Sequence, residues 1–180
     1  MNEAALTRDR ILDTAEDVLR RYGPAKANVV DVARALGVSH GSVYRHFPSK
    51  AALRDAVTER WLQRISAPLA GISEESTAAP ERLRKWLTTL VALKRQKVAQ
   101  EPELFATYRA IFAASPEAVQ AHVDSLTSQL ARVVADGVAR GEFVSSDPAS
   151  DGRALFDATA RFHAPAHAET WGEPGLDAAL

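Results

Sequence analysis

Apolar residues recur every three or four positions along most of the chain, which is the period of an amphipathic helix. The first such stripe predicts a helix from Thr7 to Tyr22, ended by Gly23. The second half of the chain shows no alternation of apolar and polar residues, the pattern typical of a half-buried strand. The chain is therefore predicted to be all-α.

Residues 29–47 predict two short helices joined by a tight turn. Asn28 is a favoured N-cap residue for the first of them, and Gly37 stands where a left-handed cap would end it. Ser39 then caps a second helix from His40 to Phe47, in which Val43 and Phe47 share one face and are assigned to the core.

The remaining residues of this second helix are polar or aromatic, and they face away from the core side. A short helix with such a surface is poorly suited to building a core. It is well suited to filling the major groove of DNA.

Pro48 ends this helix, and Ser49 caps a long helix that begins at Lys50 and extends to about Ile65. The stretch from Pro68 to Ala79 is rich in Gly, Ser, Glu and Pro and is predicted to be a loop. The order of elements gives an N-terminal three-helix domain over residues 1–50 and a helical C-terminal domain over residues 51–180.

The C-terminal half contains four further predicted helices and a short closing segment. They start at Pro80, at Glu101-Pro102, at Ser115-Pro116 and at Ser146-Asp147-Pro148, and the last segment covers Leu176 to Leu180. The first of these helices ends in the basic residues Lys94, Arg95 and Lys97, which are expected to complement the helix dipole. Pro165 is expected to end or kink the fourth.

Composition adds a small charge asymmetry to this picture. The net charge is −1, but residues 1–60 hold ten Lys and Arg residues against eight Asp and Glu residues. The sign suits DNA at the N-terminal end, although a chance partition of surface charge would give the same result. There is no Cys, no signal peptide and no membrane-spanning stretch, so a cytoplasmic protein without membrane association is expected.

The segment from about Leu6 to Leu53 resembles the tetracycline-repressor (TetR) family of one-component transcriptional regulators. The resemblance is carried by the Asn28 to Ala33 entry, by Gly37-Val38-Ser39, by Gly41-Ser42-Val43-Tyr44 and by Phe47-Pro48-Ser49-Lys50. Asn28 replaces the Thr more often found at its position. The C-terminal two-thirds match the family in helix order and spacing.

The resemblance implies a homodimer whose two recognition helices enter successive major grooves of an operator, and whose helical C-terminal domain binds a small-molecule effector. The long fourth helix would then couple effector to DNA. The predicted DNA-binding residues are Asn28, Val29, Ser39, His40, Gly41, Ser42, Tyr44, Arg45, His46 and Lys50. Asn28 or Val29 would act through a backbone amide.

Three of these residues have an alternative role that the sequence leaves open. The Tyr44 ring can pack on the core with only its hydroxyl exposed. Arg45 can pair with Asp31 or Asp55 on the surface. His46 can be a solvated helix end.

The effector domain needs a cavity, and aromatic or amphipathic residues at helical spacing are its candidate lining. These are Trp61, Trp86, Phe105, Tyr108, Phe112, His122, Leu126, Phe156 and His163. Tyr108, His122 and His163 are the sharper candidates, because each combines an apolar body with a polar tip. An ordinary core role is the alternative for all nine.

The family's dimer surface is usually built from the last two helices of each subunit. The segment Leu176 to Leu180 is short for that role, so either the given chain stops within that helix or dimerisation depends on the preceding helix. In that helix Leu155, Thr159 and Phe162 are the candidates for an apolar seam.

No motif in the sequence favours catalysis, a metal or another cofactor. His163 and His167 are four residues apart, but Pro165 between them argues against a shared helical face. There is no Gly-rich phosphate loop, nucleophile motif or HExxH, so an enzyme is not expected. The main prediction is a ligand-responsive repressor; the alternatives are an activator, or a helical scaffold protein that has lost DNA binding or ligand response.

Overall fold

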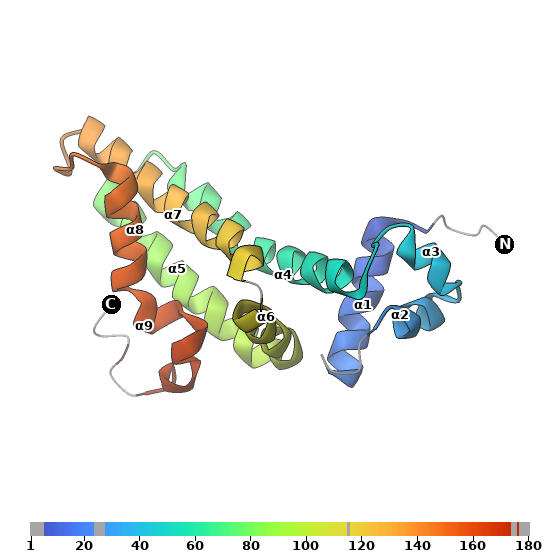
Figure 1. Cartoon of the computed structure of the whole chain (residues 1–180). Helices are drawn as coiled ribbons and strands as arrows, with labels where there is room; N and C mark the ends of the chain where they lie inside the picture. Colours follow the sequence, from blue (N-terminus) through green and yellow to red (C-terminus); the bar gives the residue numbers. More distant parts are fainter. Residues whose placement is uncertain (1–5, 24–27, 115, 174–175, 177–180) are drawn as a thin grey trace. The chain divides into compact units, whose positions relative to one another are not determined.

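The computed structural model describes residues 6–23, 28–114, 116–173 and 176, with the side chains of residues 110–118 excluded. Every regular element in these ranges is a helix, which confirms the all-α prediction (Figure 1). The helices fall into two compact units: the first contains Met1–Trp61 and Glu101–Ala118, and the second contains Leu62–Gln100 and Val119–Leu180. The predicted boundary between residues 50 and 51 remains a prediction.

The first three helices form as the sequence predicts because each terminus is capped locally. Helix α1 covers Arg8–Tyr22, α2 covers Val29–Leu36 and α3 covers His40–Tyr44. The Asn28 side chain accepts hydrogen bonds from the amides of Val30 and Asp31, and Gly37 ends α2 in the left-handed region at φ 69°. Helix α3 is shorter than predicted, although the Phe47 amide still donates to the Val43 carbonyl at 3.0 Å.

The predicted loop from Pro68 to Ala79 is wrong over its first half. Helix α4 covers Lys50–Ser73 and contains Pro68. The helix continues because its apolar stripe continues: Ile65, Leu69 and Ile72 are all buried on one face. The stabilisation from packing these side chains outweighs the loss of one backbone hydrogen bond at proline.

The second part of the first unit is α6, Pro102–Ala114, which packs on α1. Glu101, immediately before α6, accepts a 2.7 Å hydrogen bond from the Trp61 indole and a 3.4 Å one from Arg20. Glu16 is buried on α1 and accepts from Arg20 and Arg60. These carboxylates tie α1, α4 and α6 together.

The second unit is built on an antiparallel pair, α5 (Ala79–Gln100) and α7 (Pro116–Ala139). The side chains that connect them fix the register. Arg82 pairs with Asp136, and the Trp86 indole donates to the Gln129 side-chain oxygen at 2.9 Å. Because the two helices are antiparallel, a residue about eight positions after Trp86 on α5 faces a residue about two turns before Gln129 on α7.

Helix α8 (Pro148–Ala158) starts at Asp147, which accepts from the amides of Ala149 and Ser150, and it crosses α7 closely. A Cβ atom added at Gly152 would lie only 2.6 Å from the Ala131 backbone nitrogen. Glycine is thus what allows α7 and α8 to approach.

The helix is interrupted at Thr159. Helix α9 covers Ala160–His163, and the 3-10 helix η1 follows over Pro165–Thr170. The α-helix stops before Pro165, as predicted, but its interruption at Thr159 is not predicted by the sequence. In the second unit Val91, Phe162, Trp171 and Leu176 form a buried cluster. Residues 177–180 of the predicted closing segment lie outside the described residues. No helix in the described ranges is both long and apolar enough to cross a membrane.

Candidate functional site

Helix α3 is held by its cap and by two buried side chains. Ser39 accepts a hydrogen bond from the Ser42 amide at 3.2 Å, and the two serine hydroxyls lie 2.9 Å apart. Val43 is 0% and Phe47 1% exposed, which confirms their assignment to the core. The rest of α3 and the turn after it are consequently turned toward solvent.

The predicted DNA-binding residues that follow Ser39 are accessible to different degrees. His40, Gly41, Tyr44, Arg45 and Lys50 are exposed, and Ser42 and His46 are half-buried. Tyr44 is 42% exposed, so its ring, and not only its hydroxyl, is available at the surface.

Arg45 pairs with neither of the carboxylates that the sequence left open. Its guanidinium donates to the Ser42 hydroxyl at 3.4 Å. Asp31 is paired with Arg34 at 3.1 Å and Asp55 with Arg54 at 3.5 Å.

The residues at the start of α2 are more constrained. The Asn28 oxygen is occupied as the cap, and the Val29 side chain is 2% exposed. A phosphate contact through the backbone amide of Asn28 or Val29 remains a prediction.

Arg8 is a residue that sequence reasoning missed. Its guanidinium donates to the His46 carbonyl at 3.4 Å and lies 4.4 Å from the centroid of the Phe47 ring. It therefore anchors the end of α3 to the start of α1. No local pattern predicts this contact, because thirty-eight residues separate Arg8 from His46.

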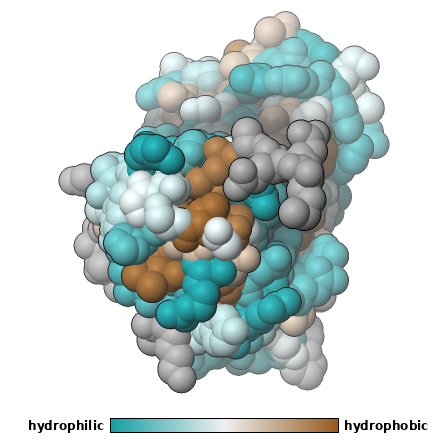
Figure 2. Space-filling view, turned by 90° about the vertical axis from the view of Figure 1, so that its right-hand side faces the viewer, coloured by the Kyte–Doolittle hydropathy of each residue, from teal (hydrophilic) through white to brown (hydrophobic). Residues whose placement is uncertain are grey.

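The charge around α3 is more strongly positive in pattern than the counts over residues 1–60 indicate. The segment from Val32 to Arg54 contains the cations Arg34, Arg45, Lys50 and Arg54 and no Asp or Glu. Figure 2 shows the face on which α2 and α3 lie, where hydrophilic residues surround a hydrophobic patch. Val30 and Tyr44 are the exposed large hydrophobic residues on α2 and α3. This surface offers guanidinium, ammonium, imidazole and hydroxyl donors to phosphates and base edges.

Three of the predicted effector residues lie together in the first unit. The rings of Trp61, Phe105 and Tyr108 form a tilted cluster with centroids 5.5 to 6.4 Å apart, and all three are buried. Burial raises the pKa of Tyr108 to about 12, so its hydroxyl stays protonated. The side chain of Phe112, also predicted, lies outside the described residues.

The other five predicted effector residues lie in the second unit, and two of them have plain structural roles. Trp86 and Leu126 are fully buried, and the Trp86 indole is satisfied by Gln129. The Phe156 and His163 rings lie 4.5 Å apart, and His163 Nε2 makes a 3.1 Å hydrogen bond with the Phe156 carbonyl. His122 is 8% exposed.

Two histidine nitrogens in this unit are buried without a hydrogen-bond partner: His122 Nε2 and His163 Nδ1. Burial, assisted by the charge of Lys94, lowers the pKa of His122 to about 3 and that of His163 to about 4. Both are neutral at physiological pH. Lys94, Arg95 and Lys97 are predicted to complement the dipole at the end of α5. The helix continues to Gln100, so of the three only Lys97 lies in its last turn, and the Lys94 side chain is buried.

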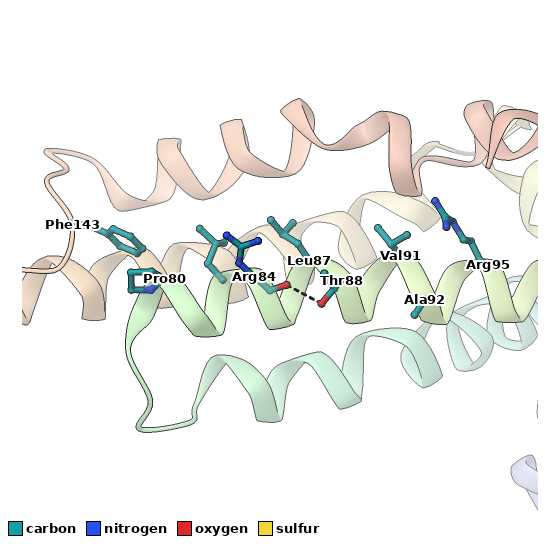
Figure 3. A pocket seen from close by; sticks show the side chains of 9 residues that line it. Pro80, Arg84, Leu87, Thr88, Val91, Ala92, Arg95 and Phe143 are labelled. Atoms are coloured by element: carbon teal, nitrogen blue, oxygen red, sulfur yellow. Dashed lines mark hydrogen bonds between the residues drawn. The ribbon is translucent and has the colours of Figure 1, made fainter. Parts of the chain in front are cut away.

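A groove of about 500 Å³ runs along α5 (Figure 3). Pro80 and Phe143 lie at one end and Arg95 at the other, with Leu87 and Val91 between them. None of the nine predicted effector residues lines it.

The predicted dimer residues do not share one surface. Leu155 and Thr159 are half-buried, whereas Phe162 is 7% exposed and packs inside its own chain with Val91 and Trp171. The seam remains a prediction for Leu155 and Thr159. His163 and His167 lie on separate elements, α9 and η1, and no three His, Asp or Glu side chains in the described ranges are grouped to hold a metal.

Comparison with known proteins gives matches in both parts of the chain. Residues 11–57 match the family described as "Bacterial regulatory proteins, tetR family", and residues 79–180 match "Tetracyclin repressor-like, C-terminal domain". A TetR-family transcriptional regulator from Pectobacterium atrosepticum has a similar structure, with a TM-score of 0.69 at 23% identity over 96% of this chain and 89% of that one.

Two curated relatives come from Mycobacterium tuberculosis. The uncharacterized HTH-type transcriptional regulator MT1294 is 33% identical over 94 residues, 52% of this chain and 46% of that protein. The HTH-type transcriptional repressor Rv1474c is 33% identical over 104 residues, 55% of this chain and 54% of that protein. The chain thus spans about half the length of the curated relatives it matches.

The C-terminal match alone covers more than half of the 180 residues, and the N-terminal match contains the capped helix pair described above. This chain belongs to the TetR family of bacterial regulatory proteins.

Proposed function

We propose that this protein is a transcriptional repressor that binds a palindromic operator as a homodimer and is released from it by a small-molecule effector. The observation that carries the proposal is the exposed surface of α3 and its flanks, where Tyr44, Arg45 and Lys50 face solvent in a segment without acidic residues. Family membership and the name of the relative Rv1474c, a transcriptional repressor, support the direction of regulation.

Each group on this surface has a defined task. Arg45 can read guanine through two parallel hydrogen bonds, and the Lys50 ammonium and the Val29 amide can bind phosphates. Gly41 carries no side chain, so the helix can approach the bases closely, and His40 and His46 add donors. In a dimer two copies of α3 would reach half-sites about 34–36 Å apart.

The effector would act by binding the DNA-bound and the released states of the dimer with different affinities. Helix α4 is the element suited to transmit the difference, because it follows α3 directly and runs as one continuous helix to Ser73. The protein would act in the cytoplasm, where its operator lies.

The test is a gel shift and footprint on the DNA that flanks the protein's own gene, carried out over a range of salt concentrations. We expect a protected palindrome. A plot of the logarithm of the binding constant against the logarithm of the salt concentration should have a slope of about −0.9 for each phosphate bound. The proposal fails if no salt-sensitive, sequence-preferring complex forms.

A further inference from the structure

The interior of the second unit contains a cation with no counter-charge. Lys94 is 7% exposed, and it makes no hydrogen bond or ion pair with any residue the structure describes. The other buried cation of α5, Arg82, is 2% exposed and is paired with Asp136. A buried charge is costly unless it is paired, so Lys94 needs a separate explanation.

The register of α5 and α7 identifies what faces Lys94. Arg82 meets Asp136 and Trp86 meets Gln129, so Lys94, two turns beyond Trp86, is opposite His122. The short helix α9, which packs on α5, adds His163. His122 Nε2 and His163 Nδ1 are the two histidine nitrogens in the described part of the chain that are buried without a hydrogen-bond partner.

The electrostatics agree with this placement. Burial lowers the pKa of Lys94 to about 8, and the charge of Lys94 contributes to the lowered pKa values of both histidines. The carboxylate that raises the pKa of His163, Asp157, is exposed and is paired with Arg153 at 2.8 Å. Lys94 and the two histidines therefore form a cluster of nitrogen groups without an acid among them.

The groove runs along the same helix that carries Lys94 (Figure 3). Successive residues of an α-helix are turned by about 100° around its axis, so Lys94 points in a direction between those of Leu83 and Leu87. Both leucines line the groove. The lining is mainly apolar, and its charged members are Arg84 and Arg95, with no Asp or Glu. Both the groove and the cluster thus favour a ligand with an apolar body and a negative charge.

We infer that Lys94, with His122, binds the carboxylate of a small amphipathic acid whose apolar body lies in the groove along α5. The inference rests on the proposed effector response and names the chemical class of that effector. Bound carboxylate would supply the missing counter-charge and accept hydrogen bonds from the Lys94 ammonium and from His122 Nε2–H. The neutral His163 ring donates from Nε2 to the Phe156 carbonyl, so its Nδ1 is an acceptor and does not donate to the carboxylate.

The binding test uses monocarboxylates from acetate to dodecanoate and benzoate, each compared with its neutral primary amide. Calorimetry on the full chain should show that at least one acid binds the wild type about tenfold more tightly than its amide does. Lys94→Met should remove this preference and leave the amide affinity unchanged. The inference is wrong if no acid is preferred over its amide, or if Lys94→Met retains the preference.

A second test needs no ligand and separates a binding role from a structural one. Lys94→Met should raise the melting temperature of the ligand-free protein, because it removes an unpaired buried charge. Arg82→Met, the matched change on the same helix, should lower it, because it removes the ion pair with Asp136 and leaves the buried Ser73 carbonyl without its donor. A fall in melting temperature for Lys94→Met comparable to that of Arg82→Met would overturn the inference.

Failure of the proposed function gives a different result. If an acid binds in a Lys94-dependent manner but does not change operator affinity, the site exists and the effector response is wrong. If the wild type releases its operator with a neutral amide as readily as with the acid, the response exists and the carboxylate site is wrong.

Discussion

The side chains of Tyr44 and Arg45 are exposed on a segment whose other side, Val43 and Phe47, is completely buried. Their backbone positions are therefore fixed by the core, while their side chains are free to make contacts outside the chain. A change at these two positions should alter recognition without altering the fold.

We predict that Tyr44→Ala with Arg45→Ala weakens operator binding by about tenfold to a thousandfold, because a good base contact is worth about 1–3 kcal/mol. Gel-shift titration measures the loss, and circular dichroism should show unchanged helix content. Arg21→Ala with Tyr22→Ala is the matched control, since it removes the same two residue types from an exposed site at the end of α1. Equal losses for the two pairs would contradict the assignment of the interface to α3.

His163 gives a prediction about pH. Burial lowers the pKa of His163 to about 4, against 6.5 for an unperturbed histidine. Between these two pH values His163 is protonated in the unfolded chain and neutral in the folded chain. The contribution of His163 to stability is therefore lost as the pH falls from about 6.5 to about 4, and amounts to about 3 kcal/mol in all.

We expect His163→Gln to flatten the fall in melting temperature between about pH 7 and about pH 4.5. His167→Gln, on the exposed side of η1, should follow the wild-type curve. His122 lies near Lys94 and adds a similar acid dependence, so a residual slope remains in His163→Gln. A wild-type slope in His163→Gln would show that folding does not lower the pKa of His163.

At the scale of the elements, the closest approach of two helices is at Gly152. An added Cβ would lie 2.6 Å from the Ala131 nitrogen and 3.0 Å from the Thr127 carbonyl oxygen, and these backbone atoms cannot move aside alone. We predict that Gly152→Ala lowers the free energy of unfolding by about 1–3 kcal/mol, because α8 must move away from α7.

Gly71 in α4 is the matched control. A Cβ atom there meets no other heavy atom within 4 Å, so Gly71→Ala should stabilise the protein by up to about 1 kcal/mol. Denaturant unfolding measures both variants. A loss at Gly71 equal to that at Gly152 would indicate that flexibility, and not the helix crossing, sets the effect.

The elements also show which features the sequence could predict. Asn28, Ser39, Ser49 and Asp147 cap helices as expected, because capping depends on the residue and the next three amides. The Gly, Ser, Glu and Pro content of residues 68–79 predicts a loop, but the buried stripe of Ile65, Leu69 and Ile72 crosses the first half of this stretch and keeps it helical.

Of the candidate sites, one could be predicted from the sequence and the others could not. The surface of α3 follows from the spacing of Val43 and Phe47 and was predictable. Lys94 was not, since a lysine near the end of a helix is usually solvated, and its burial depends on tertiary packing, including that of α9 on α5. Arg8 reaches α3 across thirty-eight residues, a distance over which sequence pattern gives no signal.

At the scale of the whole molecule, the chain passes between the two units three times, once within α4, once between α5 and α6, and once within α7. Residues 101–118 return to the unit that contains α1 to α3. Glu101 is the contact that holds this return, because it accepts from both Trp61 and Arg20.

We predict that Glu101→Ala increases amide hydrogen exchange in α1 and α6 and leaves exchange in α8 unchanged, because it leaves the buried Trp61 indole without its acceptor. Glu103→Ala is the control, as that carboxylate has no partner in the described part of the chain. Faster exchange in α8 for Glu101→Ala would mean that the two units open together.

The return of residues 101–118 has a consequence for engineering. A chimaera that fuses residues 1–61 to the sensor of another regulator would carry the recognition helix but would uncover Trp61 and the Arg20 side of α1. Exchange of specificity between regulators of this architecture therefore requires a two-segment graft. The part of this chain that is transplantable as a unit is discontinuous in its gene.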